Sequence, residues 1–135
     1  MTGKNISFPR TTILAAWIMV LSLPAAYSAS GHQETALIHT VMFSLNSAPD
    51  SEAAQEFLRE GKEILTRIPG VENFEVRRQV SGKNPYQFGF SMQFADQAAF
   101  ERYLEHPLHT SFVKERWDRE VADFLEADYI LCNPD

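Results

Sequence analysis

The segment YQFGFSMQF, residues 86–94, constrains the fold of this chain more than any other part of the sequence. Every second residue in it is aromatic or large and apolar, and the residues between them are polar or small. A period of two over these nine residues predicts a β-strand with one apolar face. On the opposite face, Gly89 and Ser91 are small enough to allow close approach by a second sheet. The apolar face consists of Tyr86, Phe88, Phe90, Met92 and Phe94.

Three more segments have the pattern of strands. Residues 36–45 are largely apolar on both faces, which is typical of a strand that is covered on both sides. Residues 71–80 alternate through Phe74 and Val76 before they become polar, which predicts a strand with a partly exposed end. Residues 124–131 predict the last strand of the chain.

The first helical region lies in residues 46–70, which predict a turn followed by a helix. Apolar or small residues recur there at helical spacing, so that they form one stripe along the helix. Acidic residues cluster early in the segment, whereas Lys62 and Arg67 come late, which matches the helix dipole. Pro69 and Gly70 are expected to stop the helix.

The second helical region is predicted to be broken in the middle. Asp96 is expected to cap a helix over residues 97–105. His106 precedes a proline, so its backbone is expected to be extended. Pro107 suits the first turn of a further helix, because its missing N–H does no harm there. That helix is expected to run through Val121.

The predicted order of elements is therefore β-α-β-β-α-β. This order suits an α+β, ferredoxin-like fold, in which a four-stranded antiparallel sheet carries helices on one face. The apolar side of residues 86–94 is expected beneath the helices, in the same layer as His39, Val41 and Phe43. The other sheet face includes Ile38 and Met42 and is too apolar for a lone sheet in water. Its simplest cover is a second copy of the chain, in a homodimeric α+β barrel; a monomer with an open face is the alternative.

Residues 1–28 have the pattern of a secretory signal peptide. Two basic residues precede an apolar run from Thr11 to Leu23, and a cut after Ser28 fits the small residues near it. The run has 13 residues, whereas a membrane-spanning helix needs about 20. We therefore expect cleavage and export to the periplasm or the medium, with no stable membrane insertion afterwards. Retention as an uncleaved anchor is the alternative.

The remainder divides into a linker at 29–35, a domain at 36–131 and a C-terminal tail at 132–135. Loss of the signal segment leaves ten basic and 18 acidic residues, a net charge of −8. Such a charge is repelled by phosphate backbones, which excludes nucleic acid as a partner. Cys132 is the only cysteine, which rules out an internal disulfide and a cysteine-rich zinc site.

Two histidines, His106 and His109, lie three residues apart in the segment YLEHPLH. They would need a third ligand to hold a metal ion, and no acidic residue or cysteine is obviously placed to supply it. We therefore predict no metal and no cofactor. For His106 we favour a structural role at the helix junction, where its ring can bond backbone groups.

Three residues are candidates for a site between sheet and helices: His39, Tyr103 and His109. A histidine in the apolar row of a strand needs a polar partner or incurs a desolvation cost. A buried histidine and tyrosine with few charges nearby form a reasonable acid–base pair for proton transfer near a carbonyl. Alternatively, His39 and His109 bond each other or a water and complete the core. The expected aromatic walls of the pocket are Phe43, Phe88, Phe90 and Phe112.

Four segments together resemble the stress-responsive alpha/beta barrel family, usually called Dabb. The segments are IHTVMFSL, IPGVENFEVRRQVS, YQFGFSMQFADQAAFERYLEHPLH and ADYI. The resemblance implies a dimeric ferredoxin-like barrel and little about activity. A plant branch of the family looks like a polyketide cyclase that uses a tyrosine and histidines matching Tyr103, His109 and His39. This chain departs from that branch at Phe88, which stands in place of a polar ring.

Three functions are compatible with the sequence. The first is an exported homodimer that binds an apolar or aromatic small molecule between sheet and helices. The second is a lyase or cyclase type of enzyme, with His109 as general base and Tyr103 as acid or orienting group. The third is a structural or stress-protective dimer with a filled core. A cavity of at least ~300 Å³ is expected for the first two and not for the third.

Overall fold

The computed structural model describes residues 35–132. The predicted signal segment, nearly all of the predicted linker and most of the predicted tail lie outside the described residues. The elements follow in the order β1 (Leu37–Leu45), α1 (Glu52–Leu65), β2 (Glu72–Arg78), β3 (Phe88–Phe94), α2 (Gln97–Glu105), α3 (Pro107–Phe112), a π-helical turn (Val113–Trp117), α4 (Asp118–Glu120) and β4 (Val121–Ile130).

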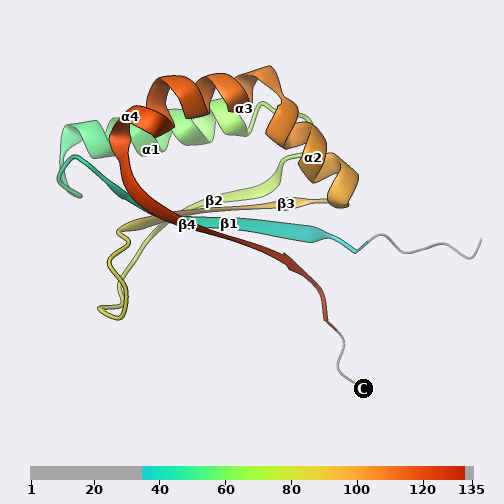
Figure 1. Cartoon of the computed structure of the whole chain (residues 1–135), viewed down its shortest axis with the longest axis horizontal. Helices are drawn as coiled ribbons and strands as arrows, with labels where there is room; N and C mark the ends of the chain where they lie inside the picture. The colour runs from blue at the N-terminus through green and yellow to red at the C-terminus, as the bar shows by residue number, and fades with distance from the viewer. Residues whose placement is uncertain (1–34, 133–135) are drawn as a thin grey trace, which may run out of the picture. The chain divides into compact units, whose positions relative to one another are not determined.

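The four strands form one antiparallel sheet in the order β2-β3-β1-β4. All the helices lie over one face of the sheet, and among residues 35–132 no element covers the other face, here called the bare face (Figure 1). The predicted α+β, ferredoxin-like architecture with helices on one face is therefore confirmed. Among the described residues, no helix combines the length and apolarity that crossing a bilayer requires.

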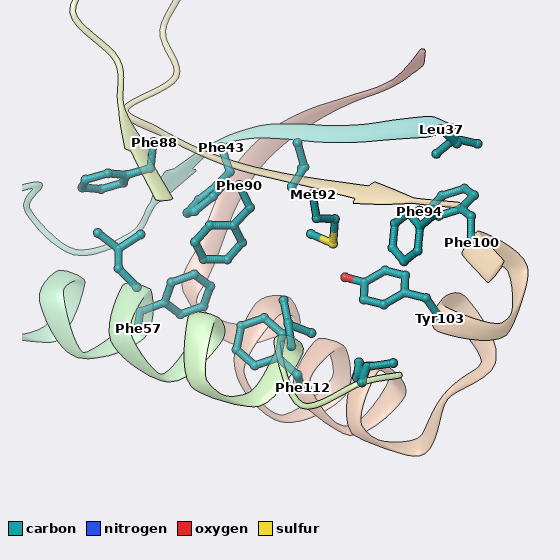
Figure 2. Close-up of a cluster of buried hydrophobic side chains, with 14 of the residues drawn as sticks. Leu37, Phe43, Phe57, Phe88, Phe90, Met92, Phe94, Phe100, Tyr103 and Phe112 are labelled. Carbon is teal, nitrogen blue, oxygen red and sulfur yellow. The ribbon is translucent and has the colours of Figure 1, made fainter. Parts of the chain in front are cut away.

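The core lies between the helices and the inner rows of β1 and β3. The register pairs Phe43 with Phe88, Val41 with Phe90 and His39 with Met92, and all six residues are buried. The alternation in the third strand decides this arrangement, because side chains of period two all point to one face. Aromatic rings from both layers meet there, as Figure 2 shows for Phe43, Phe57, Phe88, Phe90 and Phe112.

Helix α1 begins at a cap and lies very close to β3. The Ser51 hydroxyl oxygen accepts a hydrogen bond from the Ala54 backbone N–H at 3.2 Å, which satisfies one of the free donors of the first turn. Gly61 faces the core, and a Cβ atom there would lie 2.9 Å from the Phe90 ring. The missing side chain therefore allows the helix to approach the sheet. Gly70 follows the helix with a positive φ of 91°.

The second helical region is interrupted where the sequence predicts it. The Asp96 carboxylate accepts from the Ala99 N–H at 2.6 Å and caps α2. His106 has an extended backbone, and its Nδ1 accepts from the Leu108 N–H at 3.2 Å, so that its ring caps α3. This is the structural role expected for His106.

The end of this region differs from the prediction. The helix stops at Glu120, and β4 begins at Val121, three residues before the predicted start of the last strand. Val121 pairs with Leu45 of β1 across a shift in register. The prediction missed this because the additional pairing with β1 is a long-range contact, which helical spacing alone does not reveal.

Candidate functional site

A cavity of about 250 Å³ lies between the sheet and the second helical region. Residues of β1, β3 and β4 line it from the sheet, and residues of α1, α2, α3, the π-helical turn and α4 supply the rest. Its lining is mainly apolar, with a few polar groups. The lining residues are His39, Val41, Leu65, Phe90, Met92, Tyr103, His109, Phe112, Val113, Trp117, Asp118, Phe124 and Glu126.

Tyr103 is the most deeply buried polar residue of the lining, with 2% of its surface exposed. In Figure 2 its ring extends from α2, and its hydroxyl points toward Met92. Within residues 35–132 the hydroxyl has no hydrogen-bond partner. Every fully enclosed side-chain polar atom in that range has a partner, so the hydroxyl is not fully enclosed. The Tyr103 oxygen is therefore open to the cavity. Burial, and secondarily the charge of Glu126, raises the pKa of this phenol, so it is a donor and not a base.

His109 lies beside Tyr103, with ring centroids 4.5 Å apart. Its Nδ1 is 3.0 Å from the carbonyl oxygen of Leu104. A carbonyl oxygen only accepts hydrogen bonds, so the neutral ring carries its proton on Nδ1 and keeps a lone pair on Nε2. Burial lowers the pKa of His109, and the nearby His39 lowers it further, against the opposing effects of the Leu104 carbonyl and Glu126. This favours the neutral ring.

His39 has the polar partner that its buried position requires. Its Nδ1 is 2.6 Å from a carboxylate oxygen of Asp128, across the β1–β4 pairing. Its ring also packs against Phe100, at a centroid distance of 5.0 Å. The two histidines therefore do not bond each other through Nδ1, because Asp128 and the Leu104 carbonyl occupy those atoms.

Two further carboxylates, Glu126 and Asp118, lie in the lining. Glu126 comes from β4, and Asp118 is the first residue of α4. Both are exposed, and neither of them has an ion-pair or hydrogen-bond partner among the described residues. The charge of Glu126 acts on both Tyr103 and His109, raising the pKa of each.

The structure brings His39, Tyr103 and His109 to one cavity, as the sequence predicts for these candidates. Of the four phenylalanines expected as walls, Phe90 and Phe112 line the cavity. Phe43 and Phe88 do not: they lie in the packed part of the core, with ring centroids 6.0 Å apart.

Sequence reasoning missed the acidic side chains of β4. In FLEADYI, Glu126 and Asp128 share a face with Phe124. Period-two parity places this row on the same side as His39, once β4 is paired with β1. That signal was available, but it depended on knowing which strand lies next to β1. Trp117 packs against Phe43, with ring centroids 5.0 Å apart, and also lines the cavity.

No group of three or more potential metal ligands is present among residues 35–132. Asp128 adds a carboxylate beside His39, which sequence reasoning did not foresee.

A family model for the stress responsive A/B barrel domain, Dabb, matches residues 37–131. The chain belongs to this family. A crystal structure of a Dabb family protein with a ferredoxin-like fold from Mesorhizobium loti is 49% identical, with a TM-score of 0.73. The alignment covers 74% of this chain and 100% of that one. No match was found among curated proteins.

Two more distant structures share the fold of this Dabb domain. A dimeric ferredoxin-like protein of unknown function from Thermobifida fusca is 18% identical, with a TM-score of 0.61, covering 73% of this chain and 93% of that one. A hydroxynitrile lyase from Passiflora edulis is 13% identical, with a TM-score of 0.66, covering 76% of this chain and 98% of that one. At such identities the likeness extends to the fold and not to a reaction.

Proposed function

We propose that this Dabb domain binds an apolar or aromatic small molecule in the cavity between the sheet and the helices. The observation that carries the proposal is Tyr103: its side chain is buried, but its hydroxyl oxygen is open to the cavity and has no hydrogen-bond partner among the described residues. A polar group that faces a cavity without a protein partner can be satisfied by a ligand acceptor. Around it the walls are mainly aromatic and aliphatic, which is typical of small-molecule sites.

The size of the cavity limits the ligand. Its volume of about 250 Å³ is below the ~300 Å³ expected from the sequence for a ligand site. This volume favours a ligand smaller than drug size. An apolar cavity of roughly 150 Å³ already holds benzene. The ligand that fits here is one aromatic ring with a short substituent, or an aliphatic molecule of similar volume.

Mass spectrometry of small molecules that co-purify with the full chain tests this proposal. Val113 lines the cavity, so Val113→Phe would fill part of its volume. Val80→Phe is the control, because it makes the same change at a residue that is 94% exposed. We expect the co-purified molecule in the parent and in Val80→Phe, and its loss in Val113→Phe. If none of the three carries a molecule and none binds small aromatic compounds, the filled-core alternative replaces the proposal.

A second candidate is a lyase or cyclase type of enzyme, favoured by the tautomer of His109. With Nδ1 donating to the Leu104 carbonyl, the free Nε2 lone pair is available as a general base. Tyr103, with its raised pKa, would donate to a carbonyl oxygen on which negative charge develops. His39 and Asp128 would hold the adjacent wall in place.

Hydroxynitriles and β-keto esters are suitable substrates for a screen, because both react by proton transfer next to a carbonyl or its adduct. For any substrate that turns over, we expect His109→Ala to lower kcat by about 10²-fold or more, as loss of a general base does. Tyr103→Phe should lower kcat while leaving KM nearly unchanged. Turnover that survives His109→Ala at the parent rate would exclude the enzyme.

We also propose that the domain forms a homodimer through the bare face of its sheet. That face presents a group of apolar side chains that are at least partly exposed in the single chain: Ile38, Met42, Leu125 and Tyr129. The register places them on one face, because Ile38 pairs with Tyr129 and Met42 with Leu125. The ferredoxin-like protein from Thermobifida fusca is dimeric, which supports the expectation of a dimer.

Sedimentation of the full chain tests the dimer. We expect a dimer at micromolar concentration and a shift to monomer in Leu125→Asp, which places a charge in the contact. Glu75→Asp, a charge-conserving change on the polar part of the same face, should leave the dimer intact. A stable monomer of the parent would exclude it.

Export through residues 1–28 is part of the same proposal and rests on the sequence alone. Cell fractionation tests it: we expect the protein outside the cytoplasm, in a form that lacks the N-terminal segment. Recovery of the full-length chain in the cytoplasm would exclude export.

A further inference from the structure

The charged groups of the cavity are of one sign. Glu126 and Asp118 line it, and no lysine or arginine does among the described residues. Neither carboxylate has an ion-pair or hydrogen-bond partner in that part of the chain. Elsewhere in the domain several acids do pair with arginine: Glu60 and Glu120 both bond Arg116, and Asp50 bonds Arg78. The two cavity carboxylates are thus left without a neutralising cation.

The histidines of the cavity do not compensate for this charge. His109 lies where burial disfavours its protonated form. His39 is bonded to the carboxylate of Asp128. If His39 is protonated, the pair is neutral, and if it is not, the pair is negative. In neither case does the pair add net positive charge to the cavity.

The aromatic walls are suited to a cation. Trp117 and Phe124 meet edge to face at a centroid distance of 5.6 Å, and both line the cavity together with Glu126. The faces of aromatic rings attract ammonium groups, and tryptophan does so most strongly. A cation between these rings and the carboxylate would gain both interactions.

We propose that the cavity selects ligands with an aromatic or apolar body and a protonated amine, and discriminates against carboxylates of the same skeleton. This inference rests on the proposed function, since it concerns the ligand of the same cavity. The body of the ligand lies against Phe90, Met92 and Phe112, its amine lies near Glu126, and the Tyr103 hydroxyl donates to an acceptor on the ligand where there is one. An anionic group in this position would meet two carboxylates with no counter-charge, which is how a binding site rejects the wrong partner.

Three probes with nearly the same skeleton test the proposal: 2-phenylethylamine, 2-phenylethanol and phenylacetate. Their dissociation constants for the full chain are measured by ligand-observed NMR at neutral pH and low salt. We expect the amine to bind about 10-fold more tightly than the alcohol, and the alcohol more tightly than the acid. Because the carboxylates are exposed, the preference for the amine should shrink as salt screens the charges.

A variant of the carboxylate separates its charge from the rest of the cavity. Glu126→Gln keeps the shape and should reduce the preference for the amine over the alcohol to about twofold, while the alcohol binds as before. Glu63→Gln removes the same charge from the outer surface of α1, where Glu63 pairs with Arg59. We expect this control to keep the full preference for the amine over the alcohol, because a change in the net charge of the protein alone does not produce that preference.

The outcomes separate this inference from the proposed function. If all three probes bind with equal affinity, or the acid binds best, the charge preference is wrong and the cavity is still a binding site. If the preference survives Glu126→Gln and Asp118→Asn together, the two carboxylates are not its source and the inference fails. If no probe binds at millimolar concentration, the inference fails, and the co-purification experiment decides the proposed function separately.

Discussion

Strands β3 and β4 both pair with β1, one on each side, but the side chains that they direct toward the helices differ. The inner row of β3 is apolar and at most 3% exposed: Phe88, Phe90, Met92 and Phe94. The inner row of β4 has two acidic residues between two apolar ones and is exposed along its length: Phe124, Glu126, Asp128 and Ile130. The domain therefore has a filled side at β3 and an open side at β4.

The difference explains where the cavity lies. On the β3 side, phenylalanine rings fill the space up to α1, and Gly61 brings the helix into contact with them. On the β4 side, the inner positions hold carboxylates, which stay hydrated unless they are paired. Only Asp128 has such a partner, His39. A strand with this composition does not close the core, and the cavity is lined by its Phe124 and Glu126.

The largest expected effect is on the filled side. Phe90→Ala should lower the free energy of unfolding by about 3–5 kcal/mol, because it deletes a ring that is 1% exposed and packed among others. Phe124→Ala, the same change on the open side, should cost only about 1 kcal/mol, because that ring is 47% exposed. Urea denaturation measures both. Equal losses would mean that β4 is as well covered as β3.

The pair between His39 and Asp128 joins the open side to the core by a hydrogen bond. Asp128→Ala should cost about 1–2 kcal/mol, because it leaves the Nδ1 atom of a buried histidine without its partner. Asp123→Ala on the same strand serves as a control, since that exposed carboxylate bonds only the next backbone N–H. If the two variants unfold at the same urea concentration, the pair contributes nothing to the free energy of unfolding.

Gly61→Ala tests how tightly the filled side is packed. Alanine is favoured over glycine in a helix by about 1 kcal/mol, but its Cβ would lie 2.9 Å from the Phe90 ring and 3.2 Å from Phe112. Because overpacking costs about 1–3 kcal/mol, we expect a net loss of about 1 kcal/mol. Gly82→Ala, where a Cβ meets nothing within 4 Å, is the matched control. A stabilised Gly61→Ala would show that the rings can move aside freely.

The smallest expected effect is on pH dependence. Burial lowers the pKa of His109 below its ordinary value of 6.5. The unfolded chain therefore binds a proton at His109 more readily than the folded chain does. Its contribution is zero above about pH 6.5 and destabilises the fold as the pH falls below that value. We expect His109→Gln to lessen the loss of stability between about pH 7 and 5.

The same prediction has a direct control. Titration of the His109 ring by NMR should give a midpoint below that of a histidine in a short peptide, with His39 and Glu126 as the nearby charges that adjust it. An unchanged midpoint, together with an unchanged pH profile in His109→Gln, would contradict the burial argument.

Much of the filled side follows from local patterns in the chain. The alternation in residues 86–94 predicts which phenylalanines are buried, since a strand has only two faces. Pro107 and the extended residue before it predict the break in the second helical region, because proline restricts its neighbour sterically. The inner row of β1, with His39 in it, follows from the same alternation.

The open side does not follow from local pattern, and there the sequence prediction was incomplete. His39 and Asp128 are 89 positions apart, and Phe43 and Phe88 were expected in the cavity and lie outside its lining. The alternation of residues along the chain by itself determined a sheet with one aromatic face beneath helices. Only the tertiary structure decided which carboxylates meet the histidines, because a shift of one residue in the pairing of β1 with β4 would turn Glu126 and Asp128 to the other face.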